Sequence, residues 1–304
     1  CFSSFETCKI CEWCQLGCGW RTNSILNKSK SVKQSFDLTG KVAVISGGAG
    51  LLGEKHAEAI AEFGGIPILL DIDEKAGTKK ASRISNEYQV DCEFMLCDIT
   101  DESQILSVRD TLLSRFGHID ILINNAAIDP KIKDDSEINL SRLENFSIDQ
   151  WNLELSVGLT GSMLCSKIFG YEMSKDGKGV ILNISSDLGL IGPDQRIYKK
   201  EGLPENEQPV KPVTYSVIKH GLIGLTKYLA TYWADKGVRC NALCPGGIYN
   251  NQPDEFVKKI SNLIPLGRMA DEDEYKESVV FMVSEASKYM NGSILSVDGG
   301  RSIW

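Results

Sequence analysis

Apolar residues gather in short runs along the chain, and a stretch with helical spacing follows most of these runs. The first run covers residues 41–46, a helical pattern follows at 53–63, and a second run covers 66–71. Short runs rich in β-branched side chains are typical of strands. This order predicts a strand, a crossover helix and a second, parallel strand. Further strands are predicted at 92–97, 119–124, 179–185, 238–244 and 293–298.

Seven strands that alternate with helices indicate a parallel sheet. The runs are almost continuously apolar, as expected of strands that helices cover on both faces. A chain of 304 residues could hold two average domains, but the pattern shows no second one. We therefore predict an α/β fold of Rossmann type, with a doubly wound, predominantly parallel seven-stranded sheet and helices on both faces, over residues 37–304.

Residues 1–36 form a cysteine-rich segment that precedes this pattern. It holds five of the ten cysteines, Cys1, Cys8, Cys11, Cys14 and Cys18. The spacing of the last four resembles a bacterial iron–sulfur run, although a glycine replaces the usual following proline and no second run exists. Zinc is the alternative metal. We interpret the segment as a flexible extension with reduced thiols and predict no metal site, which leaves a metal-binding redox segment as the alternative.

Composition and charge exclude several classes of protein. Hydrophobic residues make up 42% and charged residues 24%, as in ordinary globular proteins. A net charge of −8 provides no overall positive field for nucleic acid or anionic membrane. No apolar run reaches the roughly 18 residues of a membrane span, and the first residues lack the pattern of a secretory signal. We expect a cytoplasmic protein with a small-molecule partner and no nucleic acid or membrane partner.

A glycine-rich loop follows the first predicted strand and opens a helix. Glycines in this position allow a tight turn, and backbone amides at the helix start can approach a pyrophosphate. Asp71 ends the second strand, 18 residues after Gly53, near the spacing at which a carboxylate binds the adenosine ribose. We predict an NAD site, with NADP as the alternative because Lys75 and Lys79 lie nearby. The residues of the loop predicted to bind the dinucleotide are Gly47, Gly50, Leu51, Leu52 and Gly53.

Tyr215 and Lys219 stand four residues apart in a predicted helix, so they share one of its faces. A neighbouring ammonium group favours the phenolate and lowers the pKa of a phenol from its ordinary value of about 10. Tyr215 could then serve as a general acid or base on a hydroxyl or carbonyl group. The other interpretation of this pair is an ordinary amphipathic helix face.

Five motifs in order resemble the short-chain dehydrogenase/reductase family, from about Leu38 to the end of the chain. They are the glycine loop, an aspartate after the third strand, an NNAA turn after the fourth, a serine pair after the fifth and the YxxxK pair. The resemblance implies a substrate oxygen held by Ser186, acid–base catalysis by Tyr215 and a nicotinamide ribose bound by Lys219. It also implies cofactor contacts at Asp98, Ile99, Asn125, Ala126, Tyr215, Lys219, Pro245, Gly246 and Ile248.

The chain departs from the family pattern at two positions in these motifs. Leu51 stands where the family usually has the middle glycine of the loop, and Gly158 stands where an asparagine is common. We expect the loop to tolerate Leu51 because Gly50 precedes it. In the family, the asparagine accompanies a helix kink and a main-chain carbonyl that holds water. Gly158 could keep the kink and the water-binding carbonyl without a side chain. The sequence therefore does not decide whether the family's proton relay operates here, and Gly158 is not among the predicted catalytic residues.

A third departure is an insertion between Ser186 and Tyr215, which are 29 positions apart instead of about a dozen. Residues 193–212 hold four of the nine prolines and predict a semi-rigid loop over the active site. Its polar groups suit a phosphorylated or nucleotide-linked sugar, or they are simply solvated. The segment resembles the flagellin-modification branch of the family, which is linked to bacterial surface sugars. These polar groups belong to Arg196, Tyr198, Lys199 and Lys200.

Taken together, these patterns predict an NAD(P)-dependent oxidoreductase of carbohydrate metabolism. It would transfer hydride between nicotinamide and a secondary alcohol or ketone, on a sugar phosphate or nucleotide sugar. The alternative is a noncatalytic dinucleotide sensor or scaffold. By analogy with the family, we expect a homodimer or homotetramer that assembles through helices near Trp151 and Tyr215 and through the carboxyl-terminal strand. Two segments, 129–145 and 249–266, are candidate lids at the carboxyl edge of the sheet.

Overall fold

The structure is a computed structural model that describes residues 31–128 and 140–304. Its strands form one sheet in the order β3-β2-β1-β4-β5-β6-β7, and every neighbouring pair is parallel. The predicted α/β fold of Rossmann type is confirmed, and each predicted strand lies within two residues of the observed one. The strands are β1 (Val42–Ser46), β2 (Ile66–Asp71), β3 (Glu93–Leu96), β4 (Ile121–Asn124), β5 (Gly179–Ile184), β6 (Val238–Pro245) and β7 (Ile294–Val297).

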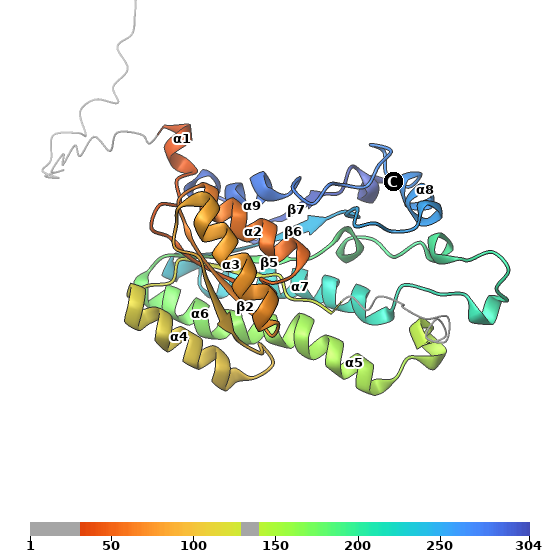
Figure 1. Cartoon of the computed structure of the whole chain (residues 1–304), viewed down its shortest axis with the longest axis horizontal. Helices are drawn as coiled ribbons and strands as arrows, with labels where there is room; N and C mark the ends of the chain where they lie inside the picture. The colour runs from red at the N-terminus through yellow and green to blue at the C-terminus, as the bar shows by residue number, and fades with distance from the viewer. Residues whose placement is uncertain (1–30, 129–139) are drawn as a thin grey trace, which may run out of the picture.

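Helices cover both faces of the sheet (Figure 1), with α2, α3 and α9 on one side and α4, α6 and α7 on the other. The α-helices are α1 (Val32–Ser35), α2 (Leu51–Glu62), α3 (Glu74–Tyr88), α4 (Glu102–Phe116), α5 (Ile148–Leu155), α6 (Ser162–Asp176), α7 (Val213–Tyr232), α8 (Asp254–Ser261) and α9 (Lys276–Val283). A π-helical turn, η3 (Ser156–Gly161), joins α5 to α6. Shorter turns are η2 (Leu143–Asn145), η4 (Asp187–Gly189), η5 (Gln195–Tyr198), η6 (Glu205–Glu207), η7 (Ala234–Lys236), η8 (Glu285–Ser287) and η9 (Arg301–Ile303).

Two apolar layers hold the sheet between these helices. On one side, Phe169 of α6 packs with α4, α7 and alternate strand residues, and on the other, Ile60 of α2 packs with α3 and α9. Both side chains are fully buried. Side chains of a strand point alternately to the two faces, so a central strand such as β1 must be apolar at every position. This explains the continuous apolar runs in the sequence.

The predicted amino-terminal extension falls largely outside the described residues, which begin at residue 31. The cysteine run at 8–18 therefore lies in a part of the chain about which the structure says nothing. Within the described ranges, no group of three His, Cys, Asp or Glu side chains could hold a metal ion. The helices of those same ranges include none with the length and apolarity needed to cross a membrane.

The five cysteines of the described ranges are all buried and none forms a disulfide. They lie in or beside the apolar layers and behave as small hydrophobic side chains. They are Cys92, Cys97, Cys165, Cys240 and Cys244.

His56 is a fully buried histidine on α2, and the Asn125 side chain lies beside its ring. Desolvation lowers the pKa of this imidazole from 6.5 to about 4, and the neighbouring Asn125 side chain opposes the shift only in part. The unfolded chain therefore binds a proton below pH 6.5 that the folded chain takes up only near pH 4. The folded protein loses stability over that interval.

We expect this histidine to cost about 3 kcal/mol of unfolding free energy between pH 7 and pH 4, since one pKa unit corresponds to about 1.4 kcal/mol. His56→Leu, which puts an apolar side chain of similar size in the place of the imidazole, should remove that part of the pH dependence. Urea unfolding of both proteins at half-unit steps from pH 7 to pH 4 measures the difference. Parallel curves for the two proteins would contradict the assignment.

Candidate active site

The predicted site residues gather at the carboxyl edge of the sheet, around a cavity of about 810 Å³. The cavity crosses the ends of β1 to β6, where ligands bind in open α/β sheets. Every predicted site residue except Gly53 lines it: Gly47, Gly50, Leu51, Leu52, Asp71, Asp98, Ile99, Asn125, Ala126, Ser186, Tyr215, Lys219, Pro245, Gly246 and Ile248.

The glycine loop closes tightly under one end of the cavity. Gly47 has φ +64°, in the left-handed region that favours glycine, and the amide of Gly50 donates to its carbonyl at 3.1 Å. A Cβ on Gly53 would lie 2.1 Å from the same carbonyl oxygen, so Gly53 supports the loop from below and does not line the cavity. Leu51 begins α2, whose amino terminus faces the cavity and favours an anion. The helix start thus accommodates Leu51 in place of glycine.

Asp71 ends β2 and fixes the loop from the neighbouring strand. Its Oδ2 accepts a hydrogen bond from the amide of Ala49 at 2.9 Å, and its Oδ1 accepts from the amide of Ile72 at 2.8 Å. Lys75 and Lys79 are exposed on α3 and do not line the cavity. Asp71 therefore adds a negative charge to this end of the cavity, which Asp73 and Asp98 also line.

Two further polar side chains shape the cavity wall. The Nδ2 of Asn125 donates to the carbonyls of Ser46 and Gly47, each at 3.1 Å, and so ties the turn after β4 to the glycine loop. Asp98 accepts from the amide and the hydroxyl of Thr100 at 2.9 and 2.7 Å. These bonds hold both predicted cofactor contacts in place.

The three predicted catalytic residues share the opposite part of the cavity. Tyr215 and Lys219 lie one turn apart on α7, with the Lys219 Nζ 5.7 Å from the centroid of the Tyr215 ring. Lys219 is buried and donates to the carbonyl of Ile184 at 2.9 Å. Ser185 and Ser186 both line the cavity; the hydroxyl of Ser185 donates to the carbonyl of Lys219 and that of Ser186 to the carboxylate of Asp187, each at 2.7 Å.

Sequence reasoning missed several residues of this site. The Nζ of Lys211, at the end of the insertion, lies 3.8 Å from the centroid of the Tyr215 ring. No spacing rule connects a loop lysine to that ring. Leu153 and Val157 also line the cavity, from α5 and η3. They stand four residues apart, so the helical period could have placed them on one face.

Gly158 lies in the π-helical turn η3, so the helix is irregular at the position where a kink was expected. Its carbonyl accepts from the Ser162 hydroxyl at 2.9 Å. A Cβ on Gly158 would lie 2.7 Å from Cγ2 of Ile218, which is the residue just before Lys219. Ile218 thus fills the space that a larger side chain at position 158 would need.

The insertion at 193–212 forms two short turns, η5 and η6, instead of a longer helix. Tyr198 packs on Phe256 of α8 with ring centroids 5.6 Å apart, and Gln208 bonds to the backbone of Lys200 and Leu203. Two of its cations, Arg196 and Lys199, form ion pairs with acidic residues of the same loop, Asp194 and Glu205.

None of the four polar residues predicted from the insertion lines the main cavity. The insertion instead forms one wall of a neighbouring cavity of about 380 Å³, together with Ser141–Glu144 and the start of α7. Lys211 belongs to this second wall and also lies over Tyr215. Of the two candidate lids, part of the first lies outside the described residues, and the second contains α8.

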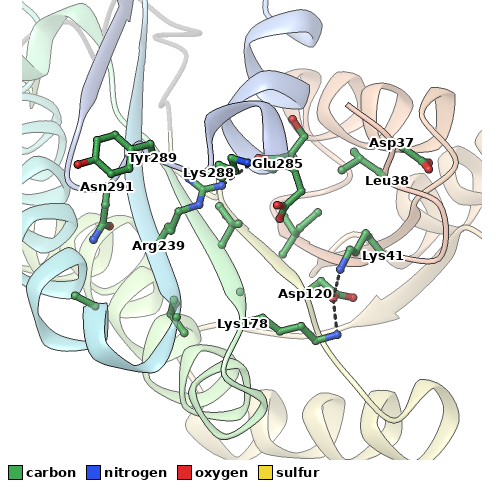
Figure 2. Close-up of a pocket in the computed structure, with 18 residues that line it drawn as sticks. Asp37, Leu38, Lys41, Asp120, Lys178, Arg239, Glu285, Lys288, Tyr289 and Asn291 are labelled. Atoms are coloured by element: carbon green, nitrogen blue, oxygen red, sulfur yellow. Dashed lines mark hydrogen bonds and ion pairs between the residues drawn. The ribbon is translucent and has the colours of Figure 1, made fainter. Parts of the chain in front are cut away.

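A third cavity, of about 490 Å³, lies at the opposite, amino edge of the sheet and includes none of the predicted site residues. Figure 2 shows the ammonium groups of Lys41 and Lys178 directed at Asp120, at 2.9 and 3.6 Å. Arg239 donates there to the carbonyls of Met290 and Ser284. The charged groups of this cavity are engaged in these ion pairs and hydrogen bonds. We therefore take the cavity at the carboxyl edge as the candidate active site.

Comparison with known proteins finds matches along most of the chain. Residues 41–198 match the short chain dehydrogenase family model, and residues 205–302 match an enoyl-(acyl carrier protein) reductase model. An uncharacterized oxidoreductase of Thermotoga maritima is 32% identical over 87% of this chain and 98% of its own length. A D-threitol dehydrogenase of Mycolicibacterium smegmatis is 29% identical over 90% and 97%.

Solved structures show the same architecture. A gluconate 5-dehydrogenase from Burkholderia cenocepacia, in complex with NADP and tartrate, superposes with a TM-score of 0.77. It is 26% identical, and the alignment covers 90% of this chain and 99% of that one. The chain therefore belongs to the short-chain dehydrogenase/reductase family and is an NAD(P)-dependent oxidoreductase that acts on alcohols or ketones.

Proposed function

We propose that this protein is an NAD-linked dehydrogenase of a sugar-derived secondary alcohol, with Ser186, Tyr215 and Lys219 as its catalytic residues. The observation that carries the proposal is one cavity with the glycine loop and Asp71 at one end and these three side chains at the other. Gly47 and Gly50 line the cavity at the amino terminus of α2, which suits the close approach of a pyrophosphate.

A nicotinamide dinucleotide bound in the cavity would supply the hydride acceptor. Tyr215, as phenolate, takes the proton of the substrate hydroxyl and returns it in the reverse direction. Lys219 favours the phenolate by its charge, and its ammonium group would bind the nicotinamide ribose. Ser186 holds the substrate oxygen by hydrogen bonding. Leu153 and Val157 add apolar surface to the wall of the cavity.

We propose NAD rather than NADP as the preferred cofactor because Asp71 lines the cavity while Lys75 and Lys79 do not. A carboxylate there would repel a 2′-phosphate. We expect kcat/KM to be at least about tenfold higher with NAD than with NADP, which corresponds to about 1.4 kcal/mol. Asp71→Asn should lower this NAD-to-NADP ratio because it removes the negative charge. Asparagine keeps an acceptor for the Ala49 amide. A wild-type preference for NADP would reject this choice.

We propose a polyhydroxylated alcohol as the substrate class. Relatives named for D-threitol and gluconate favour a polyhydroxylated substrate. The ion pairs of Arg196 and Lys199 within the insertion mean that a sugar phosphate or nucleotide sugar would have to compete with Asp194 and Glu205. The relation to the flagellin-modification branch, and with it a role in surface sugars, stays a prediction from the sequence.

The test is a turnover assay at the absorbance of the reduced nicotinamide, with NAD and NADP. Its substrate arms are uncharged polyols, sugar acids, sugar phosphates and nucleotide sugars, with simple secondary alcohols as the reference. Turnover in one sugar-derived arm above the reference supports the proposal. Turnover of simple alcohols alone rejects the sugar class. Tight NADH binding without turnover in any arm would favour the sensor, the alternative function.

A homodimer or homotetramer also stays a proposal. Large exposed side chains on α5, α6 and α7 support it, among them Leu153, Met163 and the stacked pair Tyr228 and Tyr232. The exposed Trp304 supports a second interface. Light scattering after size exclusion measures the molar mass, and a monomer would reject the proposal.

A further inference from the structure

A buried ion pair lies directly behind the candidate catalytic serine. Asp187 follows Ser186 in the turn η4, and its Oδ2 lies 2.8 Å from Nη1 of Arg301 in η9. The two side chains are 114 residues apart in sequence and only 3% and 5% exposed. Neither lines the main cavity, whereas Ser186 does. The pair therefore contacts the lining of the cavity through Ser186.

The carboxylate of Asp187 fixes the Ser186 hydroxyl. An ionised carboxylate can only accept hydrogen bonds, so the contact of 2.7 Å between Ser186 Oγ and Asp187 Oδ1 has the serine as donor. The amide of Leu188 donates to the same Oδ1 at 2.8 Å and also lies 3.2 Å from Ser186 Oγ. Two contacts thus determine where the hydroxyl oxygen lies and which way its hydrogen points.

The backbone of the turn that carries Arg301 is fixed by hydrogen bonds. The carboxylate of Asp298 accepts from the amides of Gly300 and Ser302, each at 2.9 Å, and the amide of Arg301 donates to the Asp298 carbonyl at 3.2 Å. Gly300 begins the turn with φ +88°, a conformation that glycine tolerates best. Hydrogen bonds therefore fix the backbone of the turn that carries Arg301, and the Arg301 guanidinium pairs with Asp187.

We infer that Asp187 and Arg301 are positioning residues that fix the place of the Ser186 hydroxyl oxygen at the cavity. To donate to the substrate, Ser186 must turn its hydrogen away from Asp187. While the Ser186 hydroxyl turns, Arg301 and the Leu188 amide still donate hydrogen bonds to the Asp187 carboxylate. The buried negative charge is therefore hydrogen-bonded throughout. This inference rests on the proposed role of Ser186 and adds to it a support from the far end of the chain.

The test removes both charges together, because one partner left alone would be a buried unpaired charge and the protein could fail to fold. The variant Asp187→Leu/Arg301→Met replaces the pair with apolar side chains of comparable size. We expect an unfolding temperature close to wild type, a kcat lowered about 10²-fold and a nearly unchanged KM, as for a misplaced catalytic group. The single variant Arg301→Lys, which keeps a cation beside Asp187, should have a kcat between those of the wild type and the double variant.

A double-mutant cycle separates positioning from a general structural effect. If the pair acts through Ser186, adding Asp187→Leu/Arg301→Met to Ser186→Ala should lower kcat no further, whereas independent effects would multiply. The control is Arg268→Met/Glu274→Leu, which removes an exposed bidentate Arg–carboxylate pair outside the main cavity and should leave kcat unchanged.

The outcomes distinguish this inference from the proposed function. A wild-type protein without turnover overturns the proposed function before any variant is compared. In an active enzyme, the inference fails on either of two results: the paired variant keeps its kcat, or its loss multiplies with that of Ser186→Ala. A folded paired variant with low kcat and no further loss in the combined variant supports it.

Discussion

Tyr215→Phe should lower kcat by roughly 10³-fold, in the middle of the range for loss of a general acid–base group. Phenylalanine keeps the ring beside the Lys211 and Lys219 ammonium groups and removes only the hydroxyl. The variant should therefore fold normally and bind NADH with nearly wild-type affinity. Initial rates together with an NADH fluorescence titration measure the two effects on one preparation.

Tyr232→Phe is the matched control for this experiment. Tyr232 lies on the same helix, but it is exposed, stacks on Tyr228 and does not line the cavity. Its loss of a hydroxyl should leave kcat unchanged. A Tyr215→Phe enzyme that retains wild-type turnover would show that the proton is exchanged with another group.

Gly53→Ala should weaken NADH binding about 10²-fold, which corresponds to about 3 kcal/mol. The added methyl group would lie 2.1 Å from the carbonyl oxygen of Gly47 and 2.8 Å from the Cα of Gly48. Both are backbone atoms, so the loop itself must move and its amides leave the positions that suit a pyrophosphate. The same crowding should lower the unfolding free energy by about 1–3 kcal/mol.

Gly224→Ala provides the control, since it adds the same methyl group to a helix elsewhere. A Cβ on Gly224 meets no heavy atom within 4 Å, and the position is exposed on α7. Alanine should be stabilising there by up to about 1 kcal/mol through its helix propensity, with NADH affinity unchanged. If Gly53→Ala bound NADH with wild-type affinity, the loop would accommodate the added methyl group, contrary to this prediction.

The strands and the position of the site could be predicted from the sequence because the signals are local. Apolar runs such as 66–71 mark buried strands directly, and parallel strands bring all their carboxyl ends to one edge. Asp71, Ser186 and Tyr215 each lie at or just beyond such an end, or on the helix that follows it, so their meeting in one cavity follows from the topology.

The contacts that the sequence could not predict are those between distant segments. Asp187 and Arg301 meet across 114 residues, and nothing in either local pattern indicates the other. The insertion could be predicted as a loop from its prolines, but not its packing on α8, which depends on tertiary contacts of Tyr198 with Phe256. The sequence placed Gly53 in the loop, but only the structure shows that Gly53 packs so closely against the Gly47 carbonyl that no side chain fits there.

The buried cysteines have a consequence for chemical probing. A thiol attacks alkylating or oxidising reagents as its thiolate, and burial raises the pKa of Cys92 and Cys240 to about 12 and that of Cys97 to about 11. At neutral pH the cysteines of residues 31–128 and 140–304 are thus hidden and almost entirely protonated. Alkylation of these side chains must await an opening of the sheet, so the rate at which they are labelled measures how often the folded domain opens.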